Sequence, residues 1–183
     1  DNQAVSVTVR NLNAGGGFGG SSEVTNGTSA NTITEDTEVD GETYTSTGDD
    51  ENALRVDGAT VTLKDITIEK TAGASSNTED GDFYGQNAGL LVLNGATATI
   101  TGATVNTSVT NGNGVFSYGE GTVVNISDST IRTTENNSGG IQTTGGSTMN
   151  ATNLDVETQG NSAAAIRSDR GGGTVNVDGG SYV

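Results

Sequence analysis

The feature that most constrains this chain is a repeat. Five segments with the pattern apolar–polar–apolar recur along it, and their first residues lie 37, 26, 25 and 26 positions apart. They are Val61–Leu63, Ala98–Ile100, Val124–Ile126, Met149–Ala151 and Val175–Val177. A period of about 25 residues with alternating apolar positions is typical of a solenoid, in which each repeat adds one turn to a continuous core. The sequence therefore predicts an all-β protein, a parallel β-helix with three short strands per rung.

Each rung is expected to hold a first strand, the repeated second strand and a third strand. In the first strand we expect two inward columns, because alternate residues of a strand face the same side. These columns are Leu54, Leu91, Phe116, Ile141 and Ile166, followed two residues later by Val56, Leu93, Tyr118, Thr143 and Ser168. The outward column is then Arg55, Val92, Ser117, Gln142 and Arg167. The third strand carries Ile68, Val105, Ile131 and Val156, and Tyr182 takes their place in the last rung.

The two ends depart from the pattern. Residues 1–44 are expected to form an irregular cap, with a strand at Val5, Val7 and Val9, a Gly-rich loop over 13–31 and a degenerate first rung at Thr37, Val39 and Tyr44. Residues 45–183 are expected to form the regular rungs. No capping sequence follows Tyr182, and an unpaired sheet edge is normally covered in proteins. We therefore expect either a longer parent protein or a second chain, by self-association, at this C-terminal edge.

Composition excludes several classes of function. The chain has 7 Lys and Arg against 23 Asp and Glu, for a net charge of -16, so nucleic acid and anionic membrane surfaces are poor partners. No apolar run approaches the length of a membrane span, so membrane insertion is not expected. There is no His and no Cys, which removes imidazole-based triads, disulfides and thiolate metal sites. A cation, a neutral glycan or another protein remains as a partner.

Three stretches resemble a known family. They are Asn111–Tyr118, Ser138–Thr144 and Ser162–Gly173. They look like segments of adhesin-like surface proteins of gut Firmicutes, which are right-handed parallel β-helices of pectate-lyase-like topology. The resemblance covers residues 45–183 and implies an extracellular, bacterial cell-surface location. It implies no active site.

One acidic group stands out. Asp49, Asp50 and Glu51 precede the first strand of one rung, and Glu79, Asp80 and Asp82 precede that of the next. Stacking would bring the carboxylates together, and Ca²⁺ with its preference for oxygen ligands would relieve their repulsion. The spacing matches no EF-hand loop and no nonapeptide calcium repeat. The alternative is a solvated acidic loop.

The long first interval of the repeat contains an insertion over residues 69–86. It carries Phe83 and Tyr84, an aromatic pair in a chain with 3 Phe and 4 Tyr in total. On an exposed loop this pair could stack on a sugar ring or a partner surface, or it could fold back over the solenoid. Arg167, Asp169 and Arg170 on the last rung are a second candidate binding group, with a surface ion pair as the alternative.

Three hypotheses about function follow. The first is a non-enzymatic adhesin-like module that presents loops to a host or microbial glycan or to a surface protein. The second is a polysaccharide lyase or glycoside hydrolase, which requires acids clustered on neighbouring rungs. The third is a structural or self-assembling solenoid unit.

Overall fold

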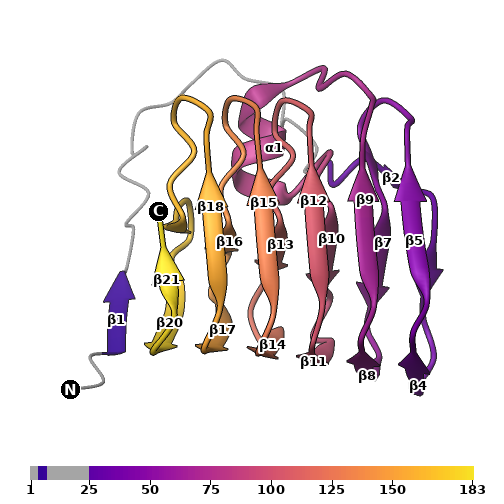
Figure 1. Cartoon of the computed structure of the whole chain (residues 1–183), viewed down its shortest axis with the longest axis vertical. Coiled ribbons are helices and arrows are strands. Elements are labelled where there is room, and N and C mark those ends of the chain that lie inside the picture. Colours follow the sequence, from indigo (N-terminus) through magenta and orange to yellow (C-terminus); the bar gives the residue numbers. More distant parts are fainter. Residues whose placement is uncertain (1–3, 8–24) are drawn as a thin grey trace, which may run out of the picture.

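The computed structural model describes residues 4–7 and 25–183, and about 49% of the chain is strand. Six rungs stack into a solenoid (Figure 1). The first three consist of β3 (Thr32–Ile33), β4 (Thr37–Asp40) and β5 (Thr43–Ser46); β7 (Leu54–Asp57), β8 (Thr60–Lys64) and β9 (Thr67–Lys70); and β10 (Leu90–Leu93), β11 (Thr97–Thr101) and β12 (Thr104–Thr107). The last three consist of β13 (Val115–Tyr118), β14 (Val123–Ser127) and β15 (Thr130–Thr133); β16 (Ile141–Thr144), β17 (Ser147–Thr152) and β18 (Asp155–Thr158); and β19 (Ile166–Ser168), β20 (Gly173–Asp178) and β21 (Ser181–Tyr182).

The rungs form three sheets, which we name by the order of their strands within a rung. The first sheet has the order β19-β16-β13-β10-β7-β3, and the third has the order β21-β18-β15-β12-β9-β5. The second sheet is β1-β20-β17-β14-β11-β8-β4, where β1 is Ala4–Val7. A short pair, β2 (Thr28–Ser29) and β6 (Glu51–Asn52), lies beside the first rungs. The predicted all-β solenoid with three strands per rung is confirmed.

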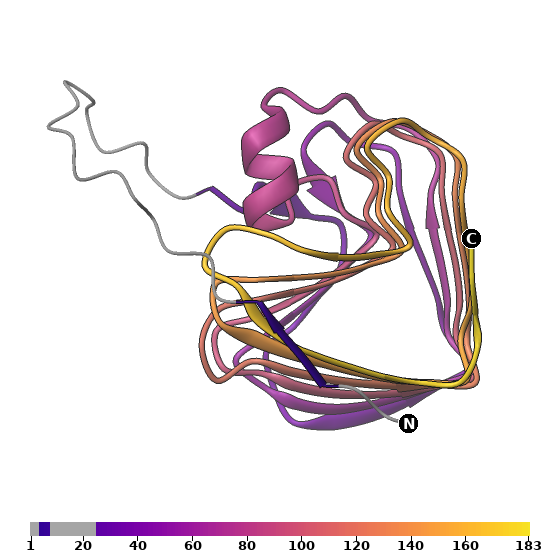
Figure 2. The ribbon, with the colours of Figure 1, turned by 90° about the vertical axis from the view of Figure 1, so that its left-hand side faces the viewer.

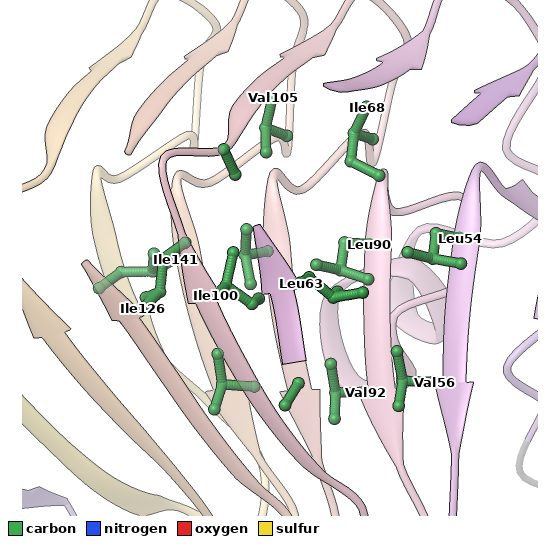
Figure 3. Close-up of a cluster of buried hydrophobic side chains, with 14 of the residues drawn as sticks. Leu54, Val56, Leu63, Ile68, Leu90, Val92, Ile100, Val105, Ile126 and Ile141 are labelled. Atoms are coloured by element: carbon green, nitrogen blue, oxygen red, sulfur yellow. The ribbon is translucent and has the colours of Figure 1, made fainter. Parts of the chain in front are cut away.

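Aliphatic side chains fill the interior. Residues of all three sheets point into one core, where Leu54 lies next to Leu90, and Ile100 next to Ile126, on neighbouring rungs (Figure 3). Most of these side chains are inaccessible to solvent because each rung is covered by the next. In the second sheet Val61, Ala98, Val124, Met149 and Val175 are in register, as the repeat predicts. Stacking of this kind gives a narrow core enough burial despite a composition that is only 30% hydrophobic.

The predicted register of the first sheet is wrong in two rungs. Leu90, not Leu91, pairs with Leu54, and Val115, not Phe116, continues that column. The true second inward column is Val56, Val92, Ser117, Thr143 and Ser168, and the outward column is Arg55, Leu91, Phe116, Gln142 and Arg167. The error arose because Leu90–Leu93 is apolar on both faces, so alternation does not distinguish inside from outside. Something must cover the outer face of these rungs.

Both ends of the solenoid carry strands outside the regular pattern. Thr37, Val39 and Tyr44 lie in β4 and β5, which pair in parallel with β8 and β9, so the degenerate first rung is present. At the other end β1 runs antiparallel to β20 and closes the last edge of the second sheet (Figures 1 and 2). The expectation of a wholly uncovered C-terminal edge is therefore corrected for this sheet. Val9 and most of the predicted Gly-rich loop lie outside the described residues.

Candidate functional site: the helix seam

The insertion after the second rung forms a short helix, α1 (Thr78–Tyr84), where the sequence analysis expected a loop. Asn77 caps its start, because the side-chain oxygen accepts hydrogen bonds from the N–H groups of Glu79 (2.9 Å) and Asp80 (3.2 Å). These two acidic residues in the first turn suit the positive end of the helix. Gly85 ends the helix in a left-handed conformation with φ of 74°, which glycine adopts without strain. The helix lies on the outside of the stacked rungs (Figure 2).

The last four carbonyl groups of α1 all receive a hydrogen bond from a side chain elsewhere in the protein. A helix leaves these carbonyls without partners of its own, so external donors fix its position. The pairs are Asn113 Nδ2 to the carbonyl of Gly81 (3.4 Å), Gln142 Nε2 to that of Asp82 (2.9 Å), Thr144 Oγ1 to that of Phe83 (2.7 Å) and Asn26 Nδ2 to that of Tyr84 (2.7 Å). Gln142 and Thr144 lie on β16, so the C-terminal half of α1 is held against the outer face of the first sheet.

A second apolar cluster lies between α1 and the first sheet. Ala88, Leu91, Leu93 and Phe116 are buried there, with Tyr118 packed against them. Apart from Ala88, which precedes β10, these are the outward residues of β10 and β13, so the helix region explains why both faces of these strands are apolar. A Cβ on Gly85 would lie 2.6 Å from Leu91 Cδ1, so the chain passes too close to the sheet for a larger residue. We call the contact region between α1 and the first sheet the helix seam.

Asp82 is the polar centre of the helix seam. Its Oδ1 accepts hydrogen bonds from Asn111 Nδ2 (3.0 Å) and Arg167 Nη1 (3.4 Å), and its Oδ2 accepts one from Asn137 Nδ2 (3.3 Å). The residue is 8% exposed, and burial raises the pKa of its carboxyl group although the neighbouring Arg167 opposes the shift. One carboxylate thus connects residues of three different rungs.

All five predicted binding residues meet at this seam. Arg167 lies between Asp82 and Asp169, with its Nη2 2.8 Å from Asp169 Oδ2. The guanidinium carbon of Arg170 lies 4.1 Å from the centre of the Phe83 ring. Tyr84 packs edge-on against Phe83 with the ring centroids 6.4 Å apart. Tyr84 also packs edge-on against Tyr118, at 5.6 Å.

The seam is partly accessible. Phe83, Tyr84, Tyr118 and Asp169 are half-buried, and Arg170 is exposed. The aromatic pair therefore neither projects freely from a loop nor disappears into the core. It forms a fixed surface of rings with one guanidinium group above it.

The six predicted calcium ligands divide between two places. Asp49 and Asp50 each accept a hydrogen bond from a backbone N–H, of Ala74 (2.7 Å) and Ser76 (2.8 Å) respectively. Burial raises the pKa of the Asp80 carboxyl group, and the nearby carboxylates of Glu79 and Asp50 raise it further. Asp82 faces the seam instead. Within residues 4–7 and 25–183 no group of three or more His, Cys, Asp or Glu side chains is placed to hold a metal ion.

A buried lysine accompanies Asp49, Asp50 and Glu51. Lys70, which was not among the predicted site residues, is 0% exposed. Its Nζ donates to Ser46 Oγ (2.9 Å) and to the carbonyl of Gly48 (2.6 Å), and Ser46 Oγ donates in turn to Glu51 Oε1 (2.7 Å). Burial lowers the pKa of Lys70, and the three carboxylates oppose this effect. These acids therefore compensate a buried positive charge.

Sequence patterns mark the two ends of α1 and the buried Lys70, but not the residues that donate hydrogen bonds to the helix. Asn77 followed by Glu79 and Asp80, with Gly85 eight residues after the cap, is a recognisable start and stop of a helix. The donors Asn113, Gln142 and Thr144 have no such signal, because their role depends on where α1 lies in space. Lys70 occupies a position that alternation assigns to the interior, and an inward lysine indicates a nearby carboxylate.

Comparison with known proteins gives no relatives: no family model, no curated protein and no solved structure matches this chain. The part of the chain that the structure describes contains no helix long and apolar enough to cross a membrane. What is established is a β-solenoid of six rungs with a helix fastened to its outer face.

Proposed function

We propose that the chain is a non-enzymatic segment of a bacterial cell-surface protein and that the helix seam binds a host or microbial glycan or a surface protein. The observation that carries the proposal is the gathering of Phe83, Tyr84, Arg167, Asp169 and Arg170 at one partly exposed place. Half-buried aromatic rings can stack on a sugar ring, and a guanidinium group can donate to its hydroxyl groups.

Rigidity supports this proposal. Four side chains hold the carbonyl end of α1, and Asp82 joins it to residues of three rungs. A surface that is already ordered loses little conformational entropy on binding. The extracellular location is part of the proposal and rests on the resemblance to adhesin-like proteins and on a fold that needs no disulfide.

Catalysis as a lyase or glycoside hydrolase has weaker support. Such an enzyme needs two carboxyl groups that reach one substrate. Asp82 and Asp169 flank Arg167, and the pKa of Asp82 is raised as in a general acid. Both oxygens of Asp82 are occupied by protein donors and the residue is 8% exposed, so a substrate would have to displace these contacts.

The test is a glycan array probed with the whole chain and with two variants. Phe83→Ala removes a ring of the seam, and Thr99→Ala changes an exposed residue on the second sheet as a matched control. We expect binding that falls about tenfold or more in Phe83→Ala, equivalent to about 1.4 kcal/mol, and is unchanged in Thr99→Ala. Binding that is equal in all three proteins would place the glycan site elsewhere. Absence of binding to any glycan, together with no binding to bacterial or host surface proteins, would overturn the proposal.

Calcium binding by Asp49, Asp50, Glu51, Glu79, Asp80 and Asp82 remains a separate prediction. A bound ion would stabilise the folded state by mass action. Thermal unfolding in calcium and in chelator measures this directly. A midpoint that falls on chelation supports the site, and an unchanged midpoint rejects it.

A further inference from the structure

The pairing of β1 with β20 differs from every other strand pairing in the second sheet. Ala4, Val5, Ser6 and Val7 lie opposite Asn176, Val175, Thr174 and Gly173 in antiparallel orientation, whereas the other neighbours in this sheet run parallel. β1 is thus not a further rung. It is an extended strand added to the free edge of β20, which is a recurrent mode of recognition through backbone hydrogen bonds.

The position of β1 in the chain does not require this pairing to occur within one molecule. β1 lies at the last rung, whereas β2, which is the next strand along the chain, pairs with β6 beside the first rungs (Figure 1). The intervening residues 8–24 number 17, enough to reach about 60 Å when extended. The first and sixth rungs are about 24 Å apart at a strand spacing of about 4.8 Å. β1 can therefore reach the β20 edge of a second molecule as well as the β20 edge of its own chain.

The two ends of the solenoid also differ in net charge. The first rung carries Glu35, Asp36, Glu38, Asp40 and Glu42, and charged residues of this kind keep edge strands apart. The sixth rung instead carries two basic and two acidic residues, so its charges balance: Arg167, Arg170, Asp169 and Asp178. Ile166 on β19 is 39% exposed, although the residues that precede it in the same column, such as Leu90 and Ile141, are at most 1% exposed.

We propose that the edge of β20 is a strand-acceptor site and that its second occupant is β1 of another copy of this chain. Two copies would exchange their β1 strands reciprocally, with their C-terminal ends facing each other. Each exchanged contact repeats a contact already made within one chain, so the exchange costs little in contact energy. The paired ends also cover Ile166. Because each copy carries a charge of -16, the dimer forms more readily at high ionic strength, where repulsion is screened.

Cysteine cross-linking tests the proposal, because the natural chain contains no Cys. Ser6 lies directly opposite Thr174, and opposed residues of antiparallel strands are close enough for a disulfide. Chains carrying Ser6→Cys are mixed with chains carrying Thr174→Cys at high protein and salt concentration and then oxidised. Chains carrying Thr62→Cys, an exposed position on β8 of the same sheet, replace Thr174→Cys in the control mixture.

We expect a covalent dimer joined between residues 6 and 174, identified by mass spectrometry of the linked peptides. Its yield should rise with protein concentration and exceed the 6–62 product by at least an order of magnitude. The double variant Ser6→Cys/Thr174→Cys, oxidised when dilute, should close within one chain and remain monomeric at high concentration. If the double variant closes but the mixture gives no more 6–174 than 6–62 product, β1 stays in its own molecule and the proposal is overturned. Failure of the double variant to close would overturn the strand-acceptor site itself.

Discussion

The interior of the solenoid and the helix seam on its outside are held together by different kinds of contact. Inside, columns of aliphatic residues repeat from rung to rung, and neighbours such as Leu54 and Leu90 make equivalent contacts. At the helix seam each contact occurs once: Thr144 Oγ1 donates to the carbonyl of Phe83, and the other three carbonyls at the end of α1 have different donors. The repeated core stabilises the whole solenoid, whereas the contacts of the helix seam hold one element, α1, in one place. The contacts of the helix seam therefore determine where α1 lies on the solenoid.

The largest expected effect comes from the interior. Leu90→Ala removes a fully buried side chain between two rungs and should lower the free energy of unfolding by about 2–5 kcal/mol. Leu91→Ala is the matched comparison, because it deletes the same atoms from the opposite face of the same strand. Urea unfolding measures the global loss, and hydrogen exchange locates it. We expect Leu91→Ala to act mainly on α1, and an equal global loss in the two variants would remove the distinction between core and seam.

A smaller effect is expected from a single fastening contact. Thr144→Val keeps the shape of the side chain but leaves the carbonyl of the half-buried Phe83 without its donor, which should cost about 1 kcal/mol. The loss should appear as faster hydrogen exchange in α1. Thr99→Val on the exposed face of the second sheet should change stability by less than about 0.5 kcal/mol. If Thr144→Val is equally neutral, this hydrogen bond does not hold the helix.

The contact between Arg170 and the ring of Phe83 should contribute less to stability than the hydrogen bond from Thr144. Arg170→Gln removes a cation from the ring face at an exposed site, where such a contact is worth about 0.5–1 kcal/mol. The same hydrogen-exchange measurement on α1 reports the change. Lys64, exposed on β8, supplies the control substitution Lys64→Gln. Identical exchange in both variants would mean that Arg170 does not stabilise the helix.

The contribution of Asp82 to stability should depend on pH. Burial raises the pKa of Asp82 above its unfolded value, so in the interval between the two pKa values the folded state binds more protons. The contribution of this residue to stability is therefore larger at low pH and is lost as the pH rises through the folded pKa. The stability of wild type relative to Asp82→Asn should increase as the pH falls from 7 towards about 4. A difference that shrinks over this range would mean that Arg167, rather than burial, dominates the environment of Asp82.

The fold could be predicted from the sequence because apolar residues recur at equivalent positions in successive rungs and make equivalent contacts. The second and third sheets follow alternation, and their predicted registers hold as far as Val156 opposite Tyr182. The first sheet failed at Leu91 and Phe116, where apolar residues face both the core and the helix seam. Alternation carries no register information where both faces of a strand are buried.

The residues of the candidate site could be named from the sequence, but their arrangement in space could not. Phe83, Tyr84 and Arg170 stood out by their rarity, yet 86 positions separate Tyr84 from Arg170 in the sequence. Their meeting depends on α1 crossing the rungs, which no local pattern encodes. Asp82 was assigned to the acidic corner because its sequence neighbours are acidic, and the turn of the helix directs it to Asn111 and Arg167 instead.

The most direct test of the account is hydrogen exchange of α1 in the unmodified protein. Because side-chain donors and an apolar underside hold the helix against the first sheet, α1 should not open independently of its neighbours. We predict that the amides of residues 81–85 are protected to a degree similar to those of β10 and β13. Exchange of these amides at the rate of an unstructured peptide, while β10 and β13 remain protected, would contradict the account.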